Sequence, residues 1–227
     1  MKKVITFTAI TLLILFGGCS GSSNNKPNYD VVSNNVTMWQ DTTGERYIIL
    51  ALEVTNITHS SLHFKDSDFD IVDGNGNIID NLKSISAYPS VVGPNETVVY
   101  YGAKISDKIN DKNNQLKAVQ HIESEKSHNN INALCINGIT GGGNTFVTGI
   151  VKNGSSRTGY NNVKIAVVAR TQSNKVVSVM KTTINSIKPH QEIEFKAEDY
   201  LIQRDLGSDI VTTYQNFAYI DPLSEPN

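Results

Sequence analysis

The stretch Gly93-Pro94-Asn95-Glu96-Thr97-Val98-Val99-Tyr100 aligns without a gap with Lys188-Pro189-His190-Gln191-Glu192-Ile193-Glu194-Phe195. In this alignment Val98 matches Ile193, and an aromatic residue closes both stretches. Proline fixes φ and cannot donate a hydrogen bond to a sheet, so in each copy it marks the entrance to a strand. The two stretches therefore predict an internal repeat built from β-strands.

A second landmark precedes each stretch at almost the same distance along the chain. Val54-Thr55-Asn56 ends one apolar run, and Val151-Lys152-Asn153 ends another. Asparagine can close a strand because its side chain forms a local turn with the backbone. Between the landmarks each copy holds a turn signal, Asp73 to Asn77 in the first and Thr171 to Asn174 in the second. We expect two copies of one unit, with chance similarity among Asn-rich loops as the alternative.

The chain from Tyr29 onward has the pattern of an antiparallel sandwich. Short runs rich in Val, Ile, Thr, Tyr and Phe alternate with clusters of Asn, Asp, Gly, Ser and Pro, and no segment shows a helical stripe. The sequence predicts an all-β fold of two tandem antiparallel β-sandwich domains. The clearest strands are expected at Tyr47 to Thr55, Asp68 to Val72, Thr97 to Tyr101, Thr145 to Lys152, Val163 to Ala169, Lys175 to Ile184, Glu192 to Phe195 and Ile210 to Ile220.

A polar segment at 123–130 divides the two units. Its sequence, Glu-Ser-Glu-Lys-Ser-His-Asn-Asn, has no apolar side chain, which is typical of a linker across which few contacts run. We expect sandwich domain 1 at 29–122, the linker at 123–130, sandwich domain 2 at 131–222 and a tail at 223–227. Each unit is long enough to bury a core without disulfides.

The N-terminus has the features of an export signal. Lys2 and Lys3 precede the apolar run Val4 to Phe16, which is shorter than the roughly 20 residues that a membrane-spanning helix needs. Gly17-Gly18-Cys19 follows, and this ending resembles the lipobox of prokaryotic lipoproteins, with Phe16 at the position more often held by Leu. We expect a signal peptide at 1–18 that is cleaved before Cys19.

The resemblance implies that Cys19 carries fatty acyl chains such as palmitate, and two or more chains make membrane anchoring stable. The alternative is an ordinary signal peptide with an incidental cysteine. The segment 19–28 is rich in Ser, Asn and Gly and is predicted to be a flexible tether. The protein is therefore expected on the outer face of the cytoplasmic membrane, or on the outer membrane if the host has two.

The two units resemble known domains of such lipoproteins. The first is similar to telokin-like, immunoglobulin-related domains of Gram-positive lipoproteins through its Val-x-Asn strand end, Phe69 to Gly76 and the Gly-Pro-x-Glu stretch. The second resembles the FxLYD-type domain at Gly149 to Asn153 and at Pro189 to Phe195, although Val167 to Thr171 stands in place of the name-giving motif. The resemblance implies immunoglobulin-like sandwiches and no catalytic role.

Composition excludes two classes of protein. The 227 residues are 39% hydrophobic and 19% charged, and 20 Lys and Arg oppose 22 Asp and Glu for a net charge of −2. A disordered polyanion would have fewer apolar residues, and a nucleic-acid binder would have an excess of basic ones. The chain also has no nucleophile elbow, phosphate-binding glycine loop or zinc-protease motif, so we expect no enzymatic activity and no cofactor.

One acidic cluster offers oxygen ligands for calcium. Asp66, Asp68, Asp70 and Asp73 lie close together in sequence, but the EF-hand spacing fails because Ile78 occupies the required glycine position. Strand periodicity gives another interpretation, in which alternate aspartates face solvent beside a buried strand. We expect no metal site, with these four residues as the calcium candidates if one exists.

The cysteines and histidines give no catalytic pattern. Cys135 lies in an apolar run and is expected to be a small buried residue of a strand. His59 and His63 lack a third ligand at metal spacing, and all five histidines, which include His121, His128 and His190, are expected to be solvated.

Two functions remain open at the level of sequence. In the first, the protein is a non-enzymatic binding or interaction module that contacts an envelope protein or polymer. In the second, it is a calcium-dependent surface module or an accessory subunit of an envelope enzyme. The sequence names neither ligand nor oligomeric state.

Overall fold

The computed structural model describes residues 27–41, 43–108, 115–127, 133–142, 145–199 and 211–220. These residues form an all-β structure without a helix, and every strand pairing in it is antiparallel. The N-terminal half contains β1 (Tyr29–Gln40), β2 (Arg46–Asn56), β3 (Leu62–Phe64), β4 (Ser67–Val72), β5 (Ile78–Ile85), β6 (Ala87–Tyr88), β7 (Val91–Val92), β8 (Thr97–Ile105), β9 (Lys117–His121) and β10 (Ser124–Lys126). The C-terminal half contains β11 (Leu134–Gly142), β12 (Phe146–Asn153), β13 (Tyr160–Thr171), β14 (Val176–Ile187), β15 (Glu192–Glu198) and β16 (Val211–Ile220).

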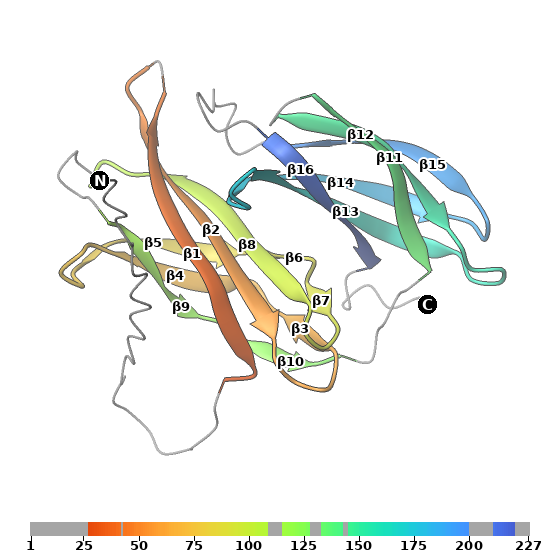
Figure 1. Ribbon diagram of the computed structural model, residues 1–227, viewed down its shortest axis with the longest axis horizontal. Helices are drawn as coiled ribbons and strands as arrows, with labels where there is room; N and C mark the ends of the chain where they lie inside the picture. Colours follow the sequence, from red (N-terminus) through yellow and green to blue (C-terminus); the bar gives the residue numbers. More distant parts are fainter. Residues whose placement is uncertain are drawn as a thin grey trace, which may run out of the picture.

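The N-terminal half is a sandwich-like arrangement of sheets (Figure 1). One sheet has the order β1-β2-β8-β6, and the other has the order β5-β4-β9. A small sheet of order β10-β3-β7 lies beside them. The hairpin expected at Asp73 to Asn77 is confirmed, because it joins β4 to β5.

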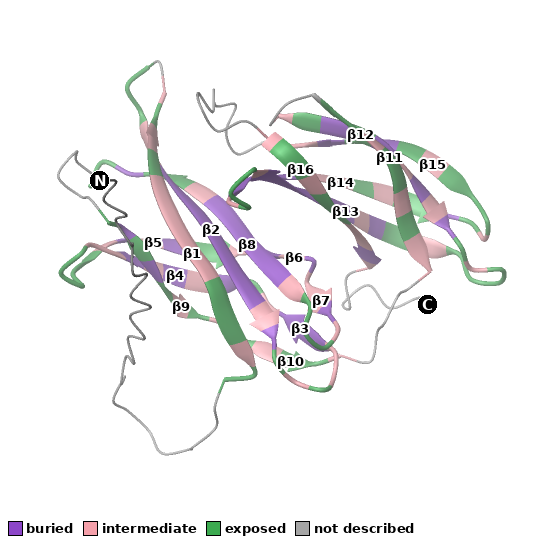
Figure 2. Cartoon of the chain, in the orientation of Figure 1, coloured by how far each residue is buried: buried purple, intermediate pink, exposed green. Residues whose placement is uncertain are grey.

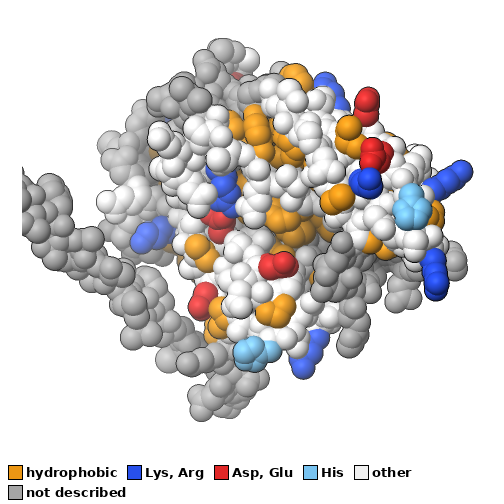
Figure 3. Space-filling view, turned by 45° about the vertical axis from the view of Figure 1, so that its right-hand side comes forward, with side chains coloured by type: hydrophobic (Ala, Val, Ile, Leu, Met, Phe, Trp, Pro, Cys, Tyr) orange, Lys and Arg blue, Asp and Glu red, His pale blue; other side chains and the backbone are white. Residues whose placement is uncertain are grey.

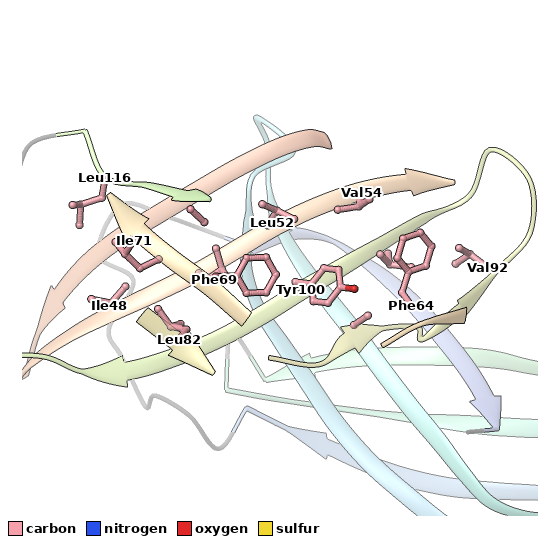
Figure 4. Close-up of a cluster of buried hydrophobic side chains, with 14 of the residues drawn as sticks. Ile48, Leu52, Val54, Phe64, Phe69, Ile71, Leu82, Val92, Tyr100 and Leu116 are labelled. Carbon is pink, nitrogen blue, oxygen red and sulfur yellow. The ribbon is translucent and has the colours of Figure 1, made fainter. Parts of the chain in front are cut away.

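Apolar side chains fill the space between these sheets (Figure 4). Strand alternation sends Ile48 and Leu52 of β2 inward, where they meet Phe69 and Ile71 of β4. The rings of Phe69 and Tyr100 pack edge to face with centroids 5.2 Å apart. The hydroxyl of Tyr100 is satisfied because it donates to the Lys65 carbonyl at 3.0 Å.

The C-terminal half repeats the strand order of the N-terminal half. Its single sheet runs β11-β12-β15-β14-β13-β16, but β15 and β14 are joined only at the pair Lys181↔Glu198. The sheet therefore bends there, and β11-β12-β15 faces β14-β13-β16 across a second apolar core around Val151, Ile165 and Val167. These two triplets correspond to β1-β2-β8 and β5-β4-β9.

The strand register also agrees between the halves. Val54 pairs with Val98 in the first half, and Val151 pairs with Ile193 in the second. Both pairs sit where the sequence alignment places them. The repeated stretches thus occupy equivalent places in equivalent sheets.

A buried asparagine closes the second strand of each half. Asn56 is fully buried, and its Nδ2 donates to the carbonyl oxygens of Ser60 at 2.8 Å and Gly93 at 3.0 Å. Asn153 is equally buried, and its Nδ2 donates to the carbonyl oxygens of Thr158 at 2.8 Å and Lys188 at 3.1 Å. Each amide therefore ties the strand end to the proline turn that comes much later in the chain.

The proline turns themselves have the same geometry. Asn95 and His190 follow the prolines with φ of 61° and 58°, the left-handed conformation that the third residue of a type II turn needs. The next residue, Glu96 in one turn and Gln191 in the other, accepts a hydrogen bond from the backbone N–H that opens the turn, at 2.6 and 2.8 Å.

The two halves pack against each other through a third apolar cluster. Ile49 and Ala51 lie on the face of β2 that points away from its own core, and they belong to one cluster with Ala166 and Val168 of β13. Consequently β2, β8 and β13 are buried on both faces, as the purple ribbons of Figure 2 show. The polar linker predicts few contacts between the units, and the structure adds an apolar cluster that draws side chains from both of them.

Polar contacts run through the same interface. Arg170 Nη2 lies 2.6 Å from Glu53 Oε1, and the two side chains are only 8% and 9% exposed. Tyr101 donates its hydroxyl to Asp199 Oδ2 at 2.7 Å, and Ser178 donates to the same oxygen at 2.7 Å. These partners come from opposite halves of the chain, apart from Ser178, which shares a half with Asp199.

The predicted linker is only partly described. Within 123–130, Ser124–Lys126 forms β10 and pairs with β3, while residues 128–130 lie outside the described residues. The signal peptide at 1–18, most of the tether and the tail at 223–227 also lie outside them. No helix in the described part of the chain has the length and apolar character needed to cross a membrane.

Candidate functional site: a cleft between the two halves

A cleft of about 900 Å³ opens where the two halves meet. The N-terminal half contributes residues on and next to β3, β6 and β10, and the C-terminal half contributes residues of β13, β14 and β16. The lining residues are His63, Phe64, Lys65, Asp66, Ser86, Ala87, Tyr88, Ser90, Glu125, Lys164, Ile165, Lys181, Thr182, Thr183 and Tyr219. A volume of this size is within the usual range for small-molecule sites.

Strand register explains the wall formed by the C-terminal half. Lys164 of β13 pairs with Thr183 of β14 and with Tyr219 of β16, so these three side chains share one face of the sheet. The same face carries Ala166 and Val168 further along β13, where it is buried against β2 and β8. The change from small apolar residues to Lys164 therefore marks the point where the packed interface ends and the cleft begins.

Lys181 and Tyr88 join the two walls. The Lys181 ammonium donates to the Tyr88 hydroxyl at 2.9 Å and lies 4.9 Å from the centroid of the Tyr88 ring. This is a cation–π contact between β14 and β6, so it crosses from one half to the other.

A charged triad lies on the opposite wall. Glu125 of β10 is 3.2 Å from His63 Nδ1 and 3.0 Å from Lys65 Nζ. The hydrogen bond from Lys65, and then that from His63, lowers the pKa of the Glu125 carboxyl below its ordinary value. Glu125 also raises the pKa of Lys65 through the same hydrogen bond. The carboxylate is thus ionised and already balanced within the protein.

The Ser90 hydroxyl is unusual because it is buried without a hydrogen bond to a described residue. Its Oγ is buried yet makes no hydrogen bond to any described residue, although its carbonyl accepts from the Phe64 N–H at 2.7 Å. A buried polar atom without a partner costs about 1–3 kcal/mol. The Ser90 hydroxyl is also not bonded to the His63 imidazole, so the pair lacks the contact that activates a serine nucleophile.

The aspartates proposed as calcium ligands have separate partners. Asp68 accepts from Lys83 Nζ at 2.7 Å and from the Ser84 N–H at 3.0 Å, and these bonds lower the pKa of its carboxyl. Asp70 Oδ2 lies 3.4 Å from His121 Nε2. Asp66 is exposed and lines the cleft.

Asp73 organises its own hairpin. It accepts from the backbone N–H groups of Asn75 and Asn77, both at 2.9 Å, and the Asn77 contacts lower the pKa of its carboxyl. Among the described residues no three carboxylate, histidine or cysteine side chains gather in a way that could hold a metal ion. Asp68, Asp70 and Asp73 are thus each engaged in separate contacts within the turns and strands.

The structure corrects two expectations about single residues. Cys135 lies in β11 as expected but is exposed rather than buried, and its Sγ is 3.8 Å from the Lys152 carbonyl oxygen. His63 is buried and paired with Glu125 rather than solvated, because it belongs to the short strand β3 instead of a loop. Cys19 and His128 lie outside the described residues.

Sequence reasoning did not find the cleft. Lys65 and Lys181 are far apart in sequence, and no local pattern links them. One available signal was the continuous apolar character of Ile48 to Leu52 and of Ile165 to Ala169, because strands buried on both faces lose their polar alternation. That pattern predicts that a second surface covers each strand.

The outer surface gives no competing charged site on the face seen in Figure 3. Acidic and basic side chains are interspersed there without a continuous basic area. The chain matches no known family model and no curated protein. The candidate site is therefore defined by the geometry of the cleft itself.

Proposed function

We propose that the protein is a lipid-anchored, non-enzymatic binding module on the outer face of a bacterial membrane, and that the cleft between its halves is the binding site. The cleft carries this proposal. It draws its polar groups from both halves, and they include lysines, hydroxyls and the Glu125 carboxylate, which Lys65 and His63 hold in place. Such a set suits holding a ligand more than breaking a bond.

The remaining parts of the proposal come from the sequence. The basic start, the apolar run and Gly17-Gly18-Cys19 support export and acylation of Cys19. The repeated strand order supports two tandem immunoglobulin-like sandwiches near the predicted bounds of 29–122 and 131–222, with β10 extending the first beyond residue 122. The partner is an envelope protein or polymer, and neither nucleic acid nor a cofactor takes part.

The anchor is tested by labelling cells with an alkyne analogue of palmitate and fractionating their membranes. We expect the wild-type chain to carry the label and to sediment with membranes, and Cys19→Ala to lose both properties. Cys135→Ala is the matched control because it removes the other cysteine, and it should behave as the wild type. Label on the Cys19→Ala chain would refute acylation at this position.

The binding site is tested by thermal unfolding of the detergent-solubilised chain with and without a size-fractionated envelope extract. A ligand that binds only the folded state raises the melting temperature of the wild type. Thr183→Trp should abolish this increase because Thr183 is exposed in the cleft, whereas Asn185→Trp, on the same strand outside the lining, should retain it. An equal increase in both variants would place binding elsewhere.

A further inference from the structure

The charges of the cleft differ in sign from those of the whole chain. The chain has a net charge of −2, but the lining holds three lysines, Lys65, Lys164 and Lys181, against the two carboxylates of Asp66 and Glu125. Lysines from both halves thus converge in an otherwise mildly acidic protein. The lining therefore carries a formal charge of +1 from its lysines and carboxylates, and a positive concave site attracts anions.

The two carboxylates do not cancel this charge at the opposite wall. Glu125 is held by Lys65 and His63 on its own side, and Asp66 is exposed. Lys181 has different surroundings, because its described contacts are a phenol oxygen and an aromatic ring rather than a carboxylate. An ammonium has three N–H donors, and the Tyr88 hydroxyl accepts one of them.

Ser90 lines the same cleft with a hydroxyl that is free for a further hydrogen bond. Its Oγ is buried and has no partner among the described residues. A hydroxyl can both donate to an oxyanion and accept from a ligand hydroxyl. Thr183, on the same face of the sheet as Lys164, adds a further hydroxyl group to the opposite wall.

We propose that the cleft binds an oxyanion carried by a hydroxyl-rich ligand, with Lys181 as the cationic anchor and Ser90 bonding to a polar group of the same ligand. This inference rests on the proposed binding function and specifies its ligand chemistry. The anion is a phosphate or a carboxylate, both of which form charge-assisted hydrogen bonds with an ammonium.

The test is isothermal titration of the full chain in non-ionic detergent with four probes. Glycerol 3-phosphate and glucuronate supply the two anions, while glycerol and glucose are their neutral counterparts. We expect saturable binding of at least one anionic probe and none of its neutral counterpart. The preferred anion identifies phosphate or carboxylate as the recognised group. Equal binding of a charged probe and its neutral counterpart, or no binding of either anion, overturns the inference.

Two variants locate the contacts. Lys181→Gln should weaken binding of the anionic probe about tenfold, which corresponds to one charge-assisted hydrogen bond. Lys117→Gln removes the same charge from an exposed position on β9 outside the cleft, and it should leave the affinity unchanged. If both substitutions weakened binding equally, the effect would come from the overall charge of the protein and not from the cleft. That result would overturn the inference.

Ser90→Ala separates a ligand contact from a structural role. Because the Ser90 hydroxyl has no partner in the described part of the chain, its removal should not lower the melting temperature of the unliganded chain, yet it should weaken probe binding. A lowered melting temperature with unchanged affinity would assign the hydroxyl to the fold and contradict its role in binding. If both anions fail while the envelope extract still stabilises the wild type but not Thr183→Trp, the ligand chemistry is wrong and the proposed function stands.

Discussion

The side-chain amides of Asn56 and Asn153 form hydrogen bonds with backbone groups at equivalent places in the two halves. Each amide donates to one carbonyl in the adjacent loop and to one at the start of the distant proline turn. In Asn56 the Oδ1 atom also accepts from the Thr58 N–H at 2.9 Å, and in Asn153 it accepts from the Ser155 N–H at 2.9 Å. Only a side chain with both donors and an acceptor can do this, so neither Asp nor Ser is an equivalent replacement.

Asn56→Ala and Asn153→Ala should each destabilise the protein by about 2–4 kcal/mol, because each leaves several buried backbone groups without a partner. Equilibrium unfolding in urea measures this change. Asn161→Ala is the matched control, since Asn161 is exposed on β13, and it should change the free energy of unfolding by less than about 0.5 kcal/mol. A loss of similar size in all three variants would contradict the role given to the buried amides.

The sequence predicted part of this arrangement. An asparagine that ends a strand by a local turn is a pattern within a few residues, and both positions were identified in that way. The second contact, to Gly93 or Lys188, is made to a segment that pairs with the strand only after folding. The burial of His63 was missed for the same reason, because it depends on the distant strand β10.

At the scale of strands, Asp80 fastens β5 to the end of β8. Its carboxylate accepts from Lys104 Nζ at 2.7 Å, from Ser106 Oγ at 2.6 Å and from the Asn81 N–H at 2.8 Å. Burial alone would raise the pKa of Asp80, but these hydrogen bonds and the Lys104 charge outweigh it and lower the pKa to about 2. The two sheets of the N-terminal half are thereby joined along one edge.

Asp80 should make stability depend on pH. A carboxyl whose pKa is about 2 in the folded state and 3.8 in the unfolded state stabilises the fold by about 2 kcal/mol above pH 4. This contribution is lost as the pH falls from 4 toward 2, because the unfolded chain then binds the proton more readily. Asp80→Asn should therefore unfold at lower urea concentration than the wild type at pH 7, with the difference shrinking below pH 4. A difference that stays constant from pH 7 to pH 2 would rule out this linkage.

Long strands were more predictable than short ones. The strands predicted at Tyr47 to Thr55 and Val163 to Ala169 lie within β2 and β13. Runs of that length contain enough apolar and β-branched residues to be recognised as strands. Strands β6 and β7 have only two residues each, so they show no periodicity, and their positions follow from the pairing partners β8 and β3. The sequence therefore did not predict the cleft either, because the short strands β3, β6 and β10 form much of one wall.

At the scale of the whole molecule, a buried ion pair crosses the interface between the halves. Glu53 accepts from Arg170 Nη2 and also from Ser33 Oγ at 3.0 Å, while Arg170 donates to the Asn174 carbonyl at 3.2 Å and to Gln215 Oε1 at 2.9 Å. Burying two charges is costly, so such a pair specifies how surfaces dock more than it adds net stability. A linear pattern cannot reveal it, because Glu53 and Arg170 lie in different repeats.

Arg170→Met should destabilise the protein by about 3–5 kcal/mol, because Glu53 would remain as an uncompensated buried charge. The double variant Glu53→Leu with Arg170→Met should recover most of that loss, and a double-mutant cycle from urea unfolding measures the coupling. Simple additivity of the two single substitutions would show that the pair does not act as a unit.

Because apolar side chains of both halves pack together on β2 and β13, moving the two halves apart would expose this cluster to water. A ligand that enters the cleft meets two walls that are already packed together. Little of its binding free energy is therefore needed to bring the walls closer. Widening the cleft for a bulkier ligand would separate the same apolar surfaces, so the packing disfavours ligands wider than the cleft. The packing between the two halves thus selects ligands by their width.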